Sequence, residues 1–268
     1  MNKRQVVNSW ISTGTFQDFI QQIFSLAEAK QSAYVCFANV HMVMESYQDK
    51  AFNQILNEAD IATPDGKPVS VYMRLFEGIK QERAAGMDVL PALLAEANQK
   101  GAAVYFYGST EDVLAKIQQK IAEEYPAVRL AGTYSPPFRT LSPEEDEEIV
   151  QMINESQPDL VFVALGCPKQ EKWMAAHKGR VQAVMLGVGQ AFLTFTGMEK
   201  RLPKWARDYS LEWAYRLWLE PKRLWKRYLV YNSWFLWLVF ARLLRKMVGL
   251  DKKLSPPAPT HLNPLKSE

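Results

Sequence analysis

The sequence predicts an α/β fold, in which a mostly parallel sheet carries helices on both faces and a helical appendage follows. Short apolar runs alternate with helix-length amphipathic segments from residue 15 to about residue 190. Some runs, such as 160–165, are apolar throughout, as strands buried between two helical layers require. After residue 199 basic residues and tryptophans become dense. We therefore expect a Rossmann-like α/β domain over 1–199, an appendage over 200–250 and a disordered, proline-rich tail over 251–268.

Composition places the chain among ordinary globular proteins. Its 268 residues are 48% hydrophobic and 23% charged, which suffices for a full core. The two cysteines, Cys36 and Cys167, are far apart, so we expect a reducing compartment without a disulfide framework or metal cluster. Met1–Trp10 carries Lys3 and Arg4 with no apolar segment behind them, so a secretory signal is not expected.

The expected elements follow from apolar spacing and from capping residues. Asp88 is the expected N-cap of its helix, Ser109 and Asp112 have the spacing of a capping box, and Ser142 begins a helix with an acidic first turn. Strands are expected over 34–38, 59–64, 104–107, 128–131, 160–165 and 184–186. Helices are expected over 15–30, 41–47, 51–58, 68–76, 88–97, 111–124, 142–156 and from 168 onward.

The stretch from Ala59 to Gly66 brings a carboxylate to the end of a strand. The strand is expected to end at Pro64, and Asp65 and Gly66 then form a turn just before the next helix. Open α/β sheets form their ligand crevice at this end of the strands. Asp65 is therefore a candidate catalytic residue, although turn chemistry alone also accounts for an Asp-Gly pair.

Three further strands end in small residues whose backbone amides can receive a diphosphate, namely Gly108-Ser109, Gly166 and Gly187-Val188-Gly189. None is a Walker loop, and the last lacks the third glycine of a dinucleotide fingerprint. Together they favour a nucleotide ligand. Gln170 could offer its amide to a base or sugar, or could simply begin a helix, and Arg83 in a loop before Gly86 suits a diphosphate.

Metal binding finds little support in the sequence. It has no Asp-x-Asp pair and no close pair of histidines, because His41, His177 and His261 are scattered. A nucleophile-elbow pattern is also missing.

The appendage is basic and aromatic. Residues 200–246 contain twelve Lys or Arg and three Asp or Glu, so the rest of the chain is net acidic although the whole carries +3. The nearly apolar run 228–240 is shorter than the roughly 20 residues of a membrane span. We expect a helix in the headgroup region of a membrane, flanked by Arg223, Lys226, Arg227, Arg242 and Arg245. A core helix and a nucleic-acid patch are the alternatives, and the run is too apolar for the latter.

In their order, these segments resemble the WecG/TagA/CpsF family of bacterial glycosyltransferases (glycosyltransferase family 26). The likeness covers about residues 33–245, while the first 30 residues match poorly. It is carried by Asn39, Thr63-Pro64-Asp65-Gly66, Glu82 to Asp88, Phe106 to Ser109, Leu165 to Glu171, Gly187-Val188-Gly189, Gly197 to Pro203, Leu211 to Leu217 and Glu220 to Arg223.

The resemblance implies an inverting enzyme, without a metal cofactor, that moves a hexose or N-acetylhexosamine from a UDP-sugar to a polyprenyl-diphosphate-linked saccharide. Its place would be the cytoplasmic membrane face, in cell-surface polysaccharide synthesis, held there through residues 200–250. By the same resemblance Asp65 would be the base, beside Asn39. Gly108, Ser109, Gly166, Gln170, Gly187 and Gly189 would bind the donor, and Arg83, Arg216 and Arg223 would bind diphosphates.

The chain departs from the family at Phe37, where some members have threonine, and at Leu193, where many have aspartate. Two other functions stay open at this point, a nicotinamide-dependent sugar-nucleotide oxidoreductase and a non-catalytic membrane adaptor. The sugar, the acceptor and the oligomeric state also stay open, and no nucleic-acid partner is expected.

Overall fold

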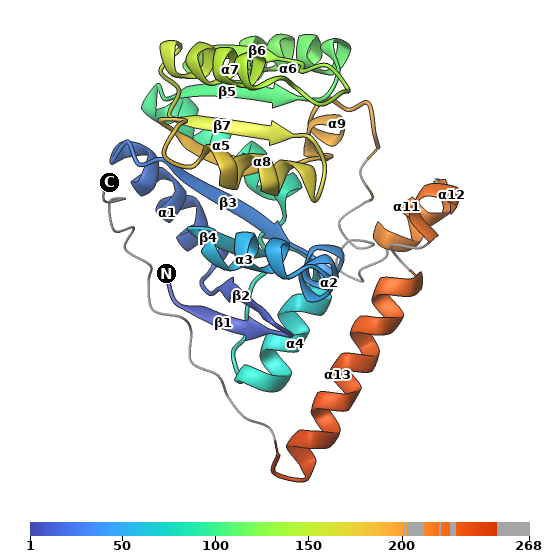
Figure 1. The fold of residues 1–268 in the computed structure, drawn as a ribbon. Coiled ribbons are helices and arrows are strands. Elements are labelled where there is room, and N and C mark those ends of the chain that lie inside the picture. Colours follow the sequence, from blue (N-terminus) through green and yellow to red (C-terminus); the bar gives the residue numbers. More distant parts are fainter. Residues whose placement is uncertain (201, 203–211, 220, 226–228, 251–268) are drawn as a thin grey trace, which may run out of the picture.

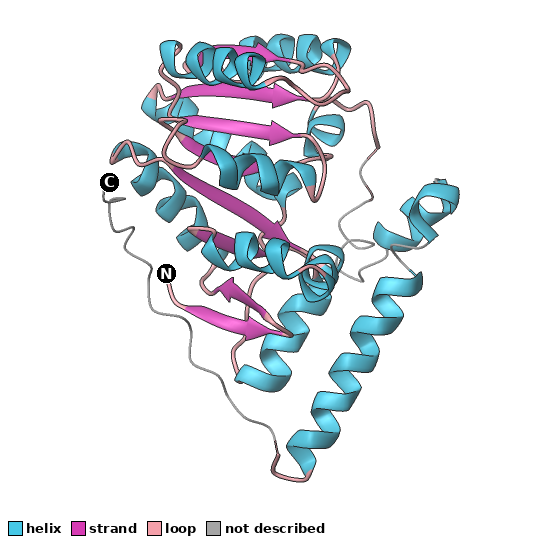
Figure 2. Cartoon of the chain, in the orientation of Figure 1, coloured by secondary structure: helices cyan, strands magenta, loops and turns pink. Residues whose placement is uncertain are grey.

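The computed structural model describes residues 1–200, 202, 212–219, 221–225 and 229–250. Within them, six strands form one parallel sheet in the order β4-β3-β8-β7-β5-β6 (Figures 1 and 2). The expected parallel α/β fold is confirmed. The strands are β3 (Ala33–Ala38), β4 (Ile61–Pro64), β5 (Ala103–Gly108), β6 (Arg129–Tyr134), β7 (Leu160–Ala164) and β8 (Val184–Gly187).

Helices cover both faces of the sheet, because successive side chains of a strand point to opposite faces. On β5, Tyr105 and Tyr107 enter one core and Val104 and Phe106 the other. The first core is closed by α2 (Val40–Gln48), α3 (Lys50–Glu58), α7 (Pro143–Glu155) and α8 (Lys169–His177). The second core is closed by α1 (Phe16–Glu28), α5 (Gly86–Lys100), α6 (Glu111–Glu124) and α9 (Ala191–Phe195).

The N-terminal segment forms a hairpin that the sequence did not predict. Strands β1 (Lys3–Val6) and β2 (Ser9–Ser12) pair antiparallel. The backbone N–H of Ala62 in β4 donates to Ser12 Oγ at 3.0 Å, so β2 covers the outer edge of β4. Such cover protects an edge strand from pairing with other chains. Strands of four residues are too short to give a clear alternation of apolar and polar residues.

Two predicted helix caps are wrong and one is confirmed. Helix α5 begins at Gly86 after Ala85, and Asp88 lies inside its first turn. Thr110, rather than Ser109, precedes α6, so there is no capping box with Asp112. Ser142 does form a capping box, because its hydroxyl accepts from the N–H of Glu145, whose carboxylate accepts from the N–H of Ser142.

The described part of the appendage consists of α11 (Glu212–Leu219), α12 (Pro221–Trp225) and α13 (Tyr231–Met247). Helix α13 lies beside α2 and beside α4 (Lys67–Glu77) (Figure 1). Phe235 is buried there, with its ring centroid 5.9 Å from that of Tyr72. One face of α13 thus packs on the domain, as the alternative of a core helix requires.

Arg242 does not flank a membrane-facing surface, and this expectation was wrong. Its guanidinium donates to Tyr72 Oη at 2.7 Å, lies 3.6 Å from Glu77 and stacks on Phe76. Arg223, Lys226, Arg227 and the tail 251–268 have side chains outside the described residues. The domain boundary near residue 200 stays a prediction.

Candidate active site

The carboxyl ends of the parallel strands meet at one edge of the sheet and form a cleft of about 830 Å³. Strands β3, β8 and β7 are neighbours there. The helices that follow β3 and β7 pack in the first core and the helix that follows β8 packs in the second, so the connections run to opposite sides of the sheet. Ligands of open α/β sheets bind at such a switch point. The volume of the cleft suits a ligand of nucleotide-sugar size. The cleft is lined by residues that follow β3, β4, β5, β7 and β8, with others from α2, α5, α8, α9 and α13.

Asp65 lies in the cleft lining, one residue beyond β4. Its backbone N–H donates to the Ala38 carbonyl at the end of β3, at 3.0 Å. Gly66 then takes a φ of 108°, a conformation that glycine adopts readily, and α4 begins at Lys67 with Pro68 in its first turn. The strand, turn and helix start were predicted from the sequence, and they hold the carboxylate at the crevice.

Asn39 also lines the cleft, directly after β3. Its side-chain Oδ1 accepts from the N–H of Met42 at 3.1 Å and caps α2. Because Ala38 of β3 pairs with Pro64 of β4, Asn39 and Asp65 each follow the end of neighbouring strands at the cleft. A role for Asn39 in the reaction stays a prediction.

Ser109, directly after β5, lines the cleft, whereas Gly108 at the end of β5 is not among the described residues that do. Gly108 has a φ of 104°, and a Cβ there would lie 2.6 Å from the Ala164 carbonyl oxygen of β7. Ser109 lines the cleft with a φ of 66°, and its N–H donates to the same oxygen at 3.1 Å. This close approach of two backbones places Ser109 at the site and explains why it cannot cap α6.

Gly108→Ala is expected to lower the free energy of unfolding by about 2 kcal/mol or more. The positive φ at this position strains an alanine backbone, and the new methyl group would clash with backbone atoms of β7. Gly179→Ala is the matched control, since Gly179 has a φ of 89° with no atom within 4 Å of a Cβ. Urea unfolding of both variants separates the backbone strain, which both share, from the clash with β7, which only Gly108→Ala has. An equal loss of unfolding free energy in the two variants would contradict the clash.

The loops after β7 and β8 face each other across Gln170 of α8. Gly166, Gln170, Gly187 and Gly189 all line the cleft, as the sequence predicted for a donor site. Gln170 Oε1 accepts from the N–H of Gly166 at 3.2 Å, and Nε2 donates to the Gly187 carbonyl at 2.6 Å. The amide of Gln170 is thus bonded to the protein in this structure.

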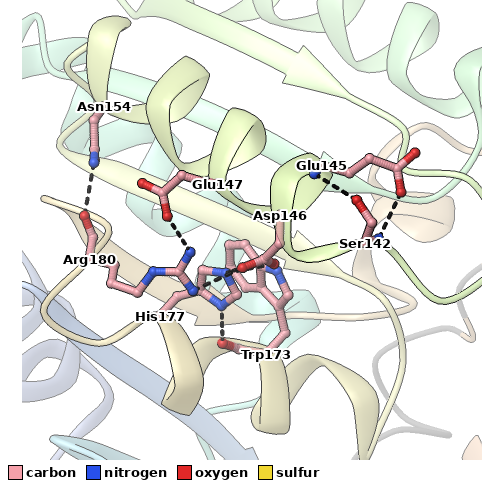
Figure 3. A network of polar contacts seen from close by, with 8 residues as sticks. All are labelled: Ser142, Glu145, Asp146, Glu147, Asn154, Trp173, His177 and Arg180. Carbon is pink, nitrogen blue, oxygen red and sulfur yellow. Dashed lines mark hydrogen bonds and ion pairs between the residues drawn. The ribbon is translucent and has the colours of Figure 1, made fainter.

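Helix α8 is also anchored at its far end, as Figure 3 shows. His177 Nδ1 lies 2.7 Å from the Trp173 carbonyl oxygen, and Nε2 lies 3.0 Å from Asp146 of α7. Arg180 donates to Asp146 at 2.9 Å and to Glu147 at 2.8 Å. The Trp173 ring stacks on His177, at 4.1 Å between ring centroids. These contacts tie α8 to α7 well away from Gln170.

The described residues that line the cleft include none of the three predicted diphosphate-binding arginines, Arg83, Arg216 and Arg223. Arg83 donates to Asp88 at 2.8 Å and is not among the described residues that line the cleft. Its loop is held against β4, because Thr63 Oγ1 donates to the Ala84 carbonyl at 2.7 Å. Arg216 of α11 and Arg223 of α12 have side chains outside the described part of the chain.

Sequence reasoning missed an aromatic wall of the cleft. Tyr231 at the start of α13 stacks on His41 of α2, with 5.3 Å between ring centroids, and donates to Glu45 at 2.9 Å. Burial raises the pKa of the Tyr231 phenol, and the hydrogen bond to the Glu45 carboxylate raises it further. His41 and Tyr231 both line the cleft. His41 could have been noticed two residues after Asn39, whereas Tyr231 gave no signal inside its apolar run.

Both departures from the family pattern lie in this cleft. Phe37 of β3 and Leu193 of α9 are among its lining residues. Both side chains are apolar and contribute apolar surface to the cleft wall. Among the described residues, no group of three or more His, Cys, Asp or Glu could hold a metal ion.

Comparisons with known proteins agree on one reaction class. The profile of the family described as "Glycosyl transferase WecG/TagA/CpsF family" matches residues 4–249, so the expectation that the first 30 residues match the family poorly was wrong. The hairpin β1–β2 packs on β4, which makes this segment part of the same body.

Three curated relatives carry the name N-acetylglucosaminyldiphosphoundecaprenol N-acetyl-beta-D-mannosaminyltransferase. That of Bacillus subtilis (strain 168) is 35% identical over 227 residues, covering 83% of this chain and 84% of the relative. That of Bacillus spizizenii is 36% identical over 75% of this chain and 77% of the relative. That of Staphylococcus aureus is 28% identical over 75% of this chain and 78% of the relative.

Proposed function

Because the chain belongs to the WecG/TagA/CpsF family of glycosyl transferases, we propose that it moves N-acetylmannosamine from UDP to N-acetylglucosamine on undecaprenyl diphosphate. The glycosyltransferase class follows from the family and from the named relatives. The choice of sugar and acceptor rests on the names of those relatives. The observation that carries the mechanism is the cleft, which combines one strand-end carboxylate with residues of the three loops that follow β5, β7 and β8.

In the proposed mechanism Asp65 accepts the proton of the acceptor hydroxyl as its oxygen bonds to the anomeric carbon. The bond from that carbon to the UDP oxygen breaks on the opposite side, so the configuration inverts. The leaving diphosphate gains negative charge, and the loops at Ser109, Gly166 and Gly189, which line the cleft, are the part of the site that would lie against it. Arg83, Arg216 and Arg223 would neutralise donor or lipid diphosphate when they reach it.

The proposed acceptor is a lipid, and α13 supports its recognition at a membrane surface. The face of α13 opposite to Phe235 exposes Leu236, Trp237 and Phe240. In the described part of the chain no helix has the length and apolarity that a membrane crossing requires. We propose that this exposed face enters the headgroup region of the cytoplasmic leaflet, which would place the cleft above the lipid diphosphate.

A donor screen tests the reaction. The full chain is mixed with undecaprenyl-diphosphate-linked N-acetylglucosamine and one UDP-sugar at a time, and released UDP and the lipid product are measured. UDP-N-acetylmannosamine is expected to give a disaccharide on the lipid. Equal rates are expected with and without EDTA, since we propose that no metal is required. If none of the tested UDP-sugars releases UDP, the proposal is overturned in favour of a non-catalytic adaptor.

The remaining alternative was an oxidoreductase that uses a nicotinamide cofactor. The family and the named relatives are transferases, so this alternative is set aside.

A further inference from the structure

Two of the loops that would hold the diphosphate come from neighbouring strands and are joined by one side chain. Gln170 is 4% exposed and lies between Gly166 after β7 and Gly187 at the end of β8. Its Oε1 accepts from the Gly166 N–H, and its Nε2 donates to the Gly187 carbonyl. The distance between the loops is therefore set by the length of one amide group.

The packing around this amide leaves no room for the loops to move closer. A Cβ at Gly187 would lie 3.0 Å from Gln170 Nε2 and 2.7 Å from Met174 Cε. A Cβ at Gly189 would lie 3.3 Å from Gln170 Oε1. Glycines at both positions thus let the backbone of the second loop rest directly on the Gln170 side chain.

Glu171 fixes which way this amide faces. Gln170 Nε2 has two hydrogens, and the second donates to Glu171 Oε1 at 2.7 Å. Turning the amide over would place its oxygen against both a carboxylate and the Gly187 carbonyl, which repel it. Glu171 is 0% exposed, is not among the described residues that line the cleft, and lies in the first turn of α8, where the helix dipole favours a carboxylate.

We propose that Glu171 is a positioning residue for the donor nucleotide and acts through Gln170. It holds the Gln170 amide in the one orientation that joins the two loops, and this fixes the spacing of the cleft wall against which the diphosphate would lie. A site whose loops are held at a fixed spacing binds its ligand without the cost of rearrangement. This inference rests on the proposed function, since it takes UDP as the ligand of the loops. It also gives Gln170 a role that needs no direct contact with sugar or base.

UDP binding to the full chain, measured by calorimetry, tests the inference. Glu171→Ala is expected to weaken UDP binding roughly tenfold or more, because Gln170 loses the partner that orients it. Glu171→Gln keeps an acceptor oxygen at the same place and is expected to recover most of the loss. The double variant Gln170→Ala/Glu171→Ala is expected to bind UDP as weakly as Gln170→Ala alone, since both residues act as one unit.

Asp146→Asn is the control for a general loosening of α8. It disturbs the His177 end of the helix, so it is expected to lower the melting temperature while UDP affinity stays unchanged. If UDP affinity falls in Asp146→Asn as far as in Glu171→Ala, helix stability rather than the Gln170 amide is responsible, and the inference is wrong.

The two proposals fail in different ways. Wild-type protein that binds no UDP would refute the proposed function. Wild-type protein that binds UDP while Glu171→Ala binds it equally well would leave the function standing and refute the role of Glu171. Additive losses in the double variant would show that Gln170 acts without Glu171, which also refutes it.

Discussion

Asp65→Asn is expected to lower the rate of sugar transfer by about 10²–10⁴-fold, the usual cost of removing a general base. The amide has the shape of the carboxylate but cannot take the acceptor proton. UDP binding is expected to stay close to wild type, because the loops that would hold the diphosphate lie on β5, β7 and β8. The measurement is single-turnover transfer to the lipid acceptor, with UDP affinity determined in parallel.

Asp60→Asn is the matched control at the other end of the same strand. Asp60 precedes β4 at the opposite edge of the sheet, where it accepts from the Tyr34 N–H at 2.9 Å and from Lys178 at 2.7 Å. Its amide variant is expected to lower stability and leave the transfer rate per folded molecule unchanged. A wild-type rate for Asp65→Asn would show that another group takes the proton.

The position of Asp65 could be predicted because its determinants are local. Pro64 ends the strand, the Asp-Gly pair turns the chain, and Pro68 suits the first turn of a helix. All lie within a few residues, so sequence spacing alone places the carboxylate at a strand end. The parallel order of strands then brings that end to the same edge as the glycine loops.

Features that depend on distant contacts could not be predicted in this way. Ser109 has capping-box spacing, but the Ala164 carbonyl of β7 draws its backbone into another conformation. Tyr231 reaches the cleft only because α13 folds back on α2, nearly two hundred residues earlier in the chain. The contacts of the Gln170 amide with Gly166 and Gly187 could not be seen from the sequence either, because Gly187 lies on another strand 17 residues further along the chain.

Replacing the exposed apolar residues of α13 is expected to abolish binding to anionic liposomes. Leu236, Trp237 and Phe240 are 63%, 60% and 52% exposed, and their replacement by glutamate leaves the buried contact of Phe235 in place. Each large apolar side chain that leaves water contributes about 1.5–3 kcal/mol, so losing three weakens binding by more than about a hundredfold. Sedimentation with vesicles that contain anionic lipid measures this.

The matched control changes the charge equally on the opposite side of the molecule. Gln17 and Gln21 on α1 and Gln99 on α5 are exposed, and glutamate at all three adds the same negative charge. This variant is expected to sediment like wild type, so that a loss specific to α13 reports its apolar face rather than repulsion by lipid.

Truncation near Leu202 is also expected to abolish sedimentation, but it removes Tyr231 from the cleft as well. The triple variant leaves Tyr231 stacked on His41, so it separates membrane binding from the shape of the site. With a lipid acceptor in vesicles it is expected to lose activity, whereas with an acceptor dissolved in detergent it is expected to keep it. Undiminished sedimentation of the triple variant would refute the membrane-facing role of α13.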